Sequence, residues 1–272
     1  MNYINKLFLP ALAMVAVLAC APSAFAYGIN ITVPDGEIRP YTYSHEDNET
    51  EYEMVQSQGW DLEGMFLKGN TLTMIGGFDF FSARPNNTGF TSGDIFISTA
   101  GGFGGTGLTT TQGNNVVQNT FGYEYALDID WINNQFKIVD LTGVSTRTQT
   151  VYYSQNTDTV PGSNPWRYYD NGTVKGNLGT VINGGKISDA ASGFSDWGLA
   201  GDSNHYVVSF DLTDFFSVAD LYGKDFDVHF TMGCGNDNLM GHTTAPVPEP
   251  STFLLLGAGL LGAGLIRRRT RK

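Results

Sequence analysis

The chain has 272 residues, 15 Lys and Arg against 27 Asp and Glu, a formal net charge of −12 and two cysteines. Lys6 and five basic residues in 267–272 lie outside the stretch from Tyr27 to Pro250. That stretch therefore carries 9 basic and 27 acidic residues, a net charge of −18. Such a surface repels nucleic acid and anionic lipid but tolerates divalent cations. The sequence has no C-x-x-C pair and no Cys/His zinc spacing, which argues against a zinc site.

The N-terminus has the layout of a secretory signal. Lys6 precedes an apolar run from Leu7 to Leu18, and Ala24 and Ala26 form an A-x-A cleavage site. We therefore expect signal peptidase to remove residues 1–26. The alternative is lipoprotein processing at Cys20. If Cys20 leaves with the signal, Cys234 is the remaining cysteine and no internal disulfide can form.

The first part of the body predicts a polar entry segment followed by a hairpin. Residues 27–53 are acidic and read as a loop with one edge strand. A Gly69-Asn70 turn joins apolar runs at 61–68 and 71–78, which is a hairpin signal. Gly76-Gly77 then indicates a bulge or a close backbone approach. A short strand at 93–98 and a Gly-rich loop at 100–118 follow.

The run from Phe121 to Asp130 alternates most clearly between apolar residues and small or acidic ones. It predicts a central strand that pairs with 135–141 through a turn at 133–134. Asp128 and Asp130 are two residues apart, so their side chains share a face. With Asp237 they are candidate Ca²⁺ ligands. The alternative is that this face is simply solvated.

Aromatic residues cluster after a predicted strand at 149–154. Trp166, Tyr168 and Tyr169 lie beside Arg167 and a predicted turn at 170–172. Proteins commonly bind sugars through exposed aromatic rings flanked by polar groups, so these three aromatic residues are candidate ligand-binding residues. The alternative is that they are core aromatics at a strand end. Residues 181–197 read as a loop.

The last third of the body predicts two strands and one helix. His205–Leu212 forms a strand, Thr213 or Asp214 begins a short helix through Leu221, and 225–232 alternates again. His229 falls on the face opposite the apolar residues, where we expect a surface histidine. Residues 233–238 predict a tight turn, and 241–246 predict a flexible linker.

Nine to eleven strands recur between turns rich in Gly, Asn and Asp, and the body has no helix of ordinary length. Residues 27–240 therefore predict an all-β fold, an antiparallel β-sandwich or jelly roll.

The C-terminal stretch, 247–272, has three parts. A proline-bounded block at 247–252 precedes an apolar segment at 253–266 and a basic end at 267–272. This is the layout of a single transmembrane helix that stops with its charges in the cytoplasm. As a helix, the 14 apolar residues would span about 21 Å, less than a hydrocarbon core of about 30 Å. Physics alone leaves open a permanent anchor or a span held briefly for processing.

Val247-Pro248-Glu249-Pro250, the Gly-broken apolar segment and the terminal arginines together resemble the PEP-CTERM sorting signal. The resemblance implies recognition by an exosortase, a membrane-embedded cysteine protease or transpeptidase. It also implies an exported bacterial envelope protein of the kind that accompanies exopolysaccharide production. The resemblance thus implies that the tail is a sorting signal that is removed by processing, and that the body stays at the cell surface or in the extracellular matrix.

A second resemblance concerns the body. Residues 122–129, 206–212 and 226–237 are similar to strands of family 9-type carbohydrate-binding β-sandwiches. This implies a sandwich fold and, more distantly, a polysaccharide ligand.

Catalytic motifs such as G-x-S-x-G, H-E-x-x-H and the P-loop do not occur, and the four histidines are scattered. We therefore expect a non-catalytic exported protein without a cofactor. The alternatives are a carbohydrate-binding module and a calcium-stabilised adhesive domain.

Overall fold

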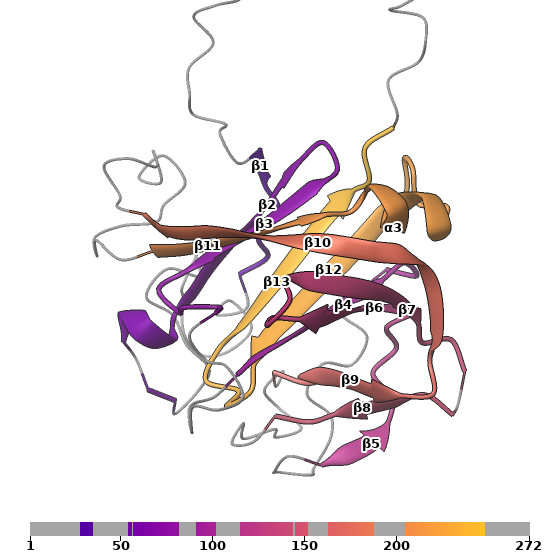
Figure 1. Cartoon of the computed structure of the whole chain (residues 1–272), viewed down its shortest axis with the longest axis horizontal. Helices are drawn as coiled ribbons and strands as arrows, with labels where there is room; N and C mark the ends of the chain where they lie inside the picture. The colour runs from indigo at the N-terminus through magenta and orange to yellow at the C-terminus, as the bar shows by residue number, and fades with distance from the viewer. Residues whose placement is uncertain are drawn as a thin grey trace, which may run out of the picture.

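The computed structural model describes residues 28–34, 54–55, 57–81, 91–101, 115–143, 145–151, 163–187 and 205–247. Every strand pair among them is antiparallel. Ten strands form one strongly curled sheet, which confirms the predicted β-sandwich class (Figure 1).

The curled sheet makes two facing layers. The first contains, in spatial order, β1 (Ile29–Asn30), β2 (Leu62–Lys68), β3 (Thr71–Gly76) and β11 (His205–Asp211). The second contains β7 (Gln135–Asp140), β6 (Tyr125–Asp130), β4 (Ser92–Ser98), β12 (Asp225–Met232) and β13 (Asn238–Thr244). β10 (Thr173–Ile187) connects them, because its first half pairs with β7 and its second half with β11.

The outer edges of the two layers also meet. Thr32 pairs with Gly241, the Val33 amide donates to the Met240 carbonyl over 2.9 Å, and the His242 amide donates to the Ile31 carbonyl over 2.8 Å. Residues 31–33 therefore close the sheet between β2 and β13. The closure leaves few unpaired backbone groups at edges that could pair with other chains.

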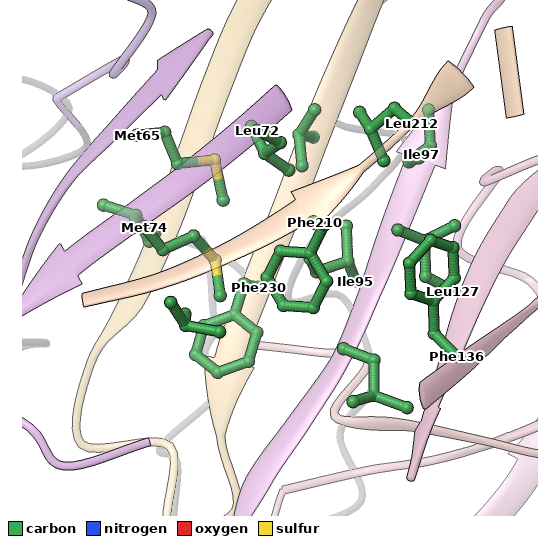
Figure 2. Packing of buried hydrophobic residues seen from close by; sticks show 14 of the residues in the cluster. Met65, Leu72, Met74, Ile95, Ile97, Leu127, Phe136, Phe210, Leu212 and Phe230 are labelled. Carbon is green, nitrogen blue, oxygen red and sulfur yellow. The ribbon is translucent and has the colours of Figure 1, made fainter. Parts of the chain in front are cut away.

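The main core fills the space between the layers. Side chains that alternate along each strand point inward and are fully buried, because period-two patterning puts every second residue on one face (Figure 2). The first layer supplies Met65, Leu72, Met74 and Phe210, and the second supplies Ile95, Leu127, Phe136 and Phe230. Helix α3 (Thr213–Val218) adds Phe215 and Phe216.

A smaller sheet of β5 (Val116–Gln118), β8 (Arg147–Gln149) and β9 (Arg167–Asp170) forms a third layer. Beneath it, Phe96, Ala126 and Val139 on the outer side of the second layer join a separate cluster with Phe121, Tyr123 and Leu141. Val117 and Tyr168 of the small sheet pack against this cluster. Strands β4, β6 and β7 are thus covered on both faces, so the outer face of β6 is not simply solvated.

Several predicted elements are confirmed. The hairpin turns at Gly69, whose φ is +56°, and Asn134 has a φ of 56° in the turn between β6 and β7. The close approach at Gly77 is confirmed too, since an added Cβ would lie 1.8 Å from the Gln58 carbonyl oxygen. Helix η2 (Gln58–Trp60) is the short 3₁₀ turn that makes this approach. β4, β11, α3 and β12 lie where the pattern placed them.

Five predictions were wrong in detail. Residues 181–187, expected as a loop, are the second half of β10 and pair with β11. Residues 241–244, expected as the start of a linker, belong to β13 and pair with β12. The strand expected over 121–130 begins only at Tyr125, and residues 116–118, expected as the end of a loop, form β5. The strand expected at 149–154 overlaps β8 (147–149) at Gln149 alone among the described residues, and 152–154 lie outside them. Backbone pairing with a neighbouring strand determines whether these segments form strands. Where a strand was missed, the sequence shows no clear alternation of apolar and polar residues that would predict it.

Candidate functional site

The described part of the body reaches the first residue of the predicted sorting block. The Ala245 amide donates to the Lys224 carbonyl over 2.8 Å, and the Gly223 amide donates to the Ala245 carbonyl over 2.9 Å. Ala245 is buried, and Val247 is exposed. The expected linker at 241–246 is therefore ordered structure up to Ala245, and the first predicted motif residue follows two positions later.

The three candidate aromatics have different surroundings. Trp166 is 8% exposed and lies over Gly93 and Gly233, where an added Cβ would come within 2.8 Å of the indole. Tyr168 is half-buried, and its hydroxyl accepts the Gly172 amide over 3.0 Å. Tyr169 is 51% exposed. Trp166 thus fills space between β9 and the second layer, and Tyr169 is the member of the three that faces solvent.

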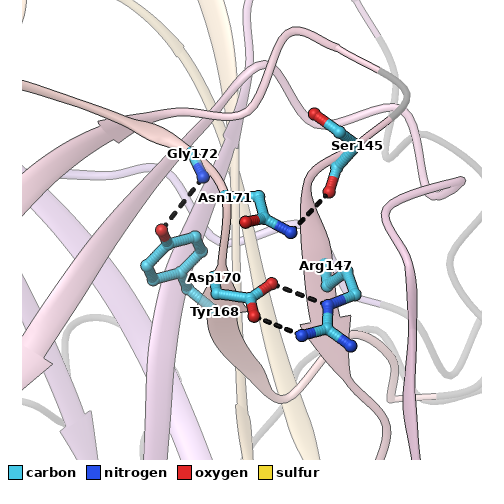
Figure 3. A network of polar contacts seen from close by, with 6 residues as sticks. All are labelled: Ser145, Arg147, Tyr168, Asp170, Asn171 and Gly172. Carbon is cyan, nitrogen blue, oxygen red and sulfur yellow. Dashed lines mark hydrogen bonds and ion pairs between the residues drawn. The ribbon is translucent and has the colours of Figure 1, made fainter.

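Tyr169 lies beside Arg147, which belongs to the polar network drawn in Figure 3. The Arg147 guanidinium is 5.1 Å from the centroid of the Tyr169 ring. Arg147 makes a bidentate ion pair with Asp170, with Nε donating over 2.7 Å to Oδ1 and Nη2 donating to Oδ2. This pair holds the pKa of Asp170 below its ordinary value and raises that of Arg147. Asn171 Nδ2 donates to the Ser145 carbonyl over 3.1 Å.

The three candidate calcium ligands do not share a site. The Asp130 carboxylate accepts the amides of Ile132 and Asn133 and the Asn133 side chain, which lower its pKa. Asp128 lies opposite Lys137 across the β6–β7 pair, and burial raises its pKa. Asp237 is fully buried and accepts the amides of Leu62 over 2.6 Å and Asn238 over 2.9 Å.

Within the described ranges, no three His, Cys, Asp or Glu residues lie close enough together to hold a metal ion. Calcium binding stays a prediction. A melting temperature that does not change on chelation would contradict it, because a ligand that binds only the folded state stabilises it.

Residues 246–269 match the family model of the PEP-CTERM protein-sorting motif. The chain carries a PEP-CTERM sorting signal. This motif implies exosortase-dependent export to the cell surface. Searches of curated proteins and of solved structures found no significant match.

Most of the sorting signal lies outside the described residues, as does the predicted apolar segment 253–266. The same holds for the predicted signal peptide, with Ala24 and Ala26. In the part of the chain that the structure does describe, no helix is long and apolar enough to cross a membrane.

Sequence patterns did not single out Asp94, whose carboxylate is fully buried. Its Oδ1 accepts the Ile129 amide over 2.9 Å, and its Oδ2 accepts the Tyr168 amide over 2.8 Å, so it joins β4, β6 and β9. Burial raises the pKa of Asp94 to about 7, against the opposing charge of Arg167. Asp94 therefore fastens the small sheet to the sandwich and is not exposed to a substrate.

His229 was expected at the surface, and the structure shows that this expectation was wrong. Its ring is fully buried and stacks on Tyr123 at 5.6 Å, and neither ring nitrogen has a hydrogen-bond partner among the described residues. Burial lowers the pKa of His229 to about 3. The alternation of β12 correctly placed His229 on the outer face, but Tyr123 and the third layer, which come from elsewhere in the chain, cover that face.

A second buried histidine has an acidic partner. His205 Nδ1 lies 2.5 Å from Glu63 Oε2, and Gln58 Nε2 donates to the other oxygen of Glu63. Glu63 lies at the register shift between β2 and β3, which the nearby Gly76-Gly77 pair signals in the sequence. Both partners are enclosed in the body, as is Cys234, whose pKa is raised to about 11 by burial.

Proposed function

We propose that this chain is a non-catalytic protein of the cell surface or extracellular matrix whose C-terminal signal is processed by exosortase. Signal peptidase removes residues 1–26, the apolar segment 253–266 holds the chain in the membrane, and 267–272 stays on the cytoplasmic side. Exosortase then acts at Val247-Pro248-Glu249-Pro250. The β-sandwich body remains outside the cell.

The match at residues 246–269 carries this proposal. Two further observations support it. The described body is ordered through Ala245, and Val247, the first residue of the motif, is exposed, which suits recognition of the motif by a protease. Four titratable side chains of the body have almost no exposed surface: Glu63, Asp94, His205 and His229. Such enclosure suits structural roles better than chemistry on a substrate.

The test is replacement of Pro248, Glu249 and Pro250 by alanine in the native cells, with mass spectrometry of both chain ends. We expect the wild-type protein to lose its tail and the variant to keep it. Replacement of the exposed body residues Ile132 and Val174 by alanine is the control and should leave processing intact. Normal processing of the triple variant would contradict the proposal.

Polysaccharide binding at Tyr169 is a second candidate function of the body. The Tyr169 side chain is 51% exposed, so its ring offers apolar surface for sugar CH groups beside the Arg147 guanidinium. The Arg147–Asp170 pair, drawn in Figure 3, supplies donors and acceptors for sugar hydroxyls. The placement of Trp166 inside the body leaves Tyr169 as the main contact.

A glycan array and titration calorimetry on the purified body, with and without calcium, test this candidate. We expect Tyr169→Ala to abolish any binding, and the equally exposed Val174→Ala to leave it unchanged. Absence of binding to envelope or matrix polysaccharide by the wild-type body would remove the candidate.

A further inference from the structure

Both ends of the described body lie at the same end of the sandwich. Ile29 pairs with Leu67, next to the Gly69-Asn70 turn, and Thr244 pairs with Asp225. The bridge between Thr32 and Gly241 is antiparallel, so β1 and the last residues of β13 leave the sheet side by side. In Figure 1, β1, α3 and the yellow end of β13 all lie at the top of the view.

Helix α3 is attached to this end. The Leu212 amide donates to the Asn70 carbonyl over 2.8 Å, and Asn70 Nδ2 donates to the Thr213 hydroxyl over 3.0 Å. The turn at 222–224 follows the helix and holds Ala245 through the two backbone bonds described above. We call the turn at 69–70, helix α3 and the turn at 222–224 the α3 end.

The connection from the α3 end to the apolar segment is short. Val247 is the last described residue, and Phe253 begins the apolar segment six positions later. Six residues span at most about 20 Å even when fully extended. Since Ala245 is hydrogen-bonded to the 222–224 turn, the folded body cannot lengthen this connection without breaking β13.

The opposite end of the body is much farther from the apolar segment. β12 runs for eight residues from Asp225 to Met232, a rise of about 26 Å. Beyond it, the Asn236 side chain exchanges hydrogen bonds with the backbone of Val55, which is 61% exposed. Val55 therefore marks the far end, and Val218 of α3, which is 39% exposed, marks the near end.

Charge does not draw the α3 end to lipid. Its exposed side chains include Asp214, Asp220 and Asp225, and Lys224 is engaged by Asp220 over 2.7 Å. An acidic surface is repelled by anionic headgroups. Any closeness to the membrane must come from the short covalent connection.

We propose that the α3 end of the body faces the membrane surface while the sorting signal is in place, held there by the short connection and not by lipid affinity. The far end, at Val55, points away. This inference rests on the proposed function, because it requires residues 253–266 to be in the membrane.

The test uses the full chain in vesicles of phosphatidylethanolamine and phosphatidylglycerol that carry headgroup nitroxide. A fluorophore is attached in separate variants at Val218→Cys and Val55→Cys. The native cysteines are Cys20 and the buried, free Cys234, and the unsubstituted chain measures their background labelling. We expect quenching at position 218 to be at least threefold stronger than at position 55.

A control variant inserts twenty Gly and Ser residues after Val247. Because a flexible chain of that length extends the reach by roughly 25 Å, quenching at position 218 should fall toward the value at position 55. Equal quenching at both positions in the chain without the insertion, or unchanged quenching after the insertion, would overturn the inference while leaving sorting intact. A chain that does not float with the vesicles would overturn the inference and the membrane step of the proposed function together.

Discussion

The two faces of the second sandwich layer differ in chemistry. Strands β4, β6 and β12 present one set of side chains to the main core and another set to the outer side of the layer. On the inner side these strands present Ile95, Leu127 and Phe230, which are fully buried hydrophobic residues. On the outer side of the same layer lie Asp94 and His229, also fully buried. One pattern of alternation thus separates the main hydrophobic core from a mixed region, where Asp94 and His229 are buried beside the smaller hydrophobic cluster around Phe96.

The difference concerns what each region requires for stability. The inner core depends on close packing, so it is sensitive to lost volume and insensitive to pH. The outer space depends on the protonation state of enclosed polar groups, because burial penalises the charged form. Substitutions on the inner side of the layer should therefore lower stability equally at all pH values, and substitutions on the outer side should change how stability depends on pH.

The largest effect is expected in the inner core. Phe230 packs against Phe80 and Trp131, with ring centroids 5.8 and 6.3 Å away. Phe230→Ala should lower the free energy of unfolding by about 3–5 kcal/mol, through lost burial and a cavity. Urea denaturation at two pH values measures this, with Ile132→Ala at an exposed position as the control. A strongly pH-dependent loss would contradict the contrast between the regions.

The next largest effect is the pH dependence of the free energy of unfolding that Asp94 causes. Its pKa in the folded chain is about 7, against an ordinary value of 3.8, so the folded chain holds the proton over this window. The stability that protonated Asp94 contributes is present below about pH 4 and is lost as pH rises through 7, a fall of about 4 kcal/mol. Denaturation of Asp94→Asn between pH 4 and 8 should show a profile that lacks this fall. Identical profiles would mean that Asp94 does not titrate in this range.

His229 should act in the opposite direction. Its folded pKa of about 3 lies below the ordinary 6.5, so stability is present above pH 6.5 and is lost as pH falls toward 3. His229→Phe keeps a flat ring against Tyr123 and cannot be protonated. At pH 5 it should be more stable than the wild type by about 2 kcal/mol relative to their difference at pH 7. If the variant loses stability equally at both pH values, the imidazole has a stabilising partner.

The smallest effect is expected at the outer surface. Tyr169→Ala should change the free energy of unfolding by no more than about 0.5 kcal/mol, because half of the side chain is already in water. The same denaturation experiment measures it. A large loss would show that Tyr169 is a structural residue of the small sheet, which would weaken the case for a sugar contact there.

The sequence predicts most of the inner core. Phe226, Val228 and Phe230 alternate along a segment bounded by turn residues, and the same holds for Leu127 and Ile129. Such patterns specify which face of a strand is buried. They do not specify that the opposite face is buried too, so the covered positions of Asp94 and His229 could not be read from them.

The candidate site shows the same division. The sorting signal is a contiguous block whose residue types and order carry its meaning, and it was recognisable without a fold. Trp166, Tyr168 and Tyr169 are adjacent in sequence, yet one lies inside the body, one is half-buried and one is exposed. Arg147, which lies over Tyr169, comes from another strand, β8, and no local pattern connects the two.

The sequence by itself determined the class of the fold, the strands with strong alternation and the sorting signal, because each depends on residues close together along the chain. Tertiary structure decided the pairing of β10 and β13, the third layer over β4, β6 and β7, and the common end at which β1 and β13 leave the body. These features depend on backbone hydrogen bonds and contacts between distant segments, which glycine-rich and polar stretches form without a side-chain pattern to announce them.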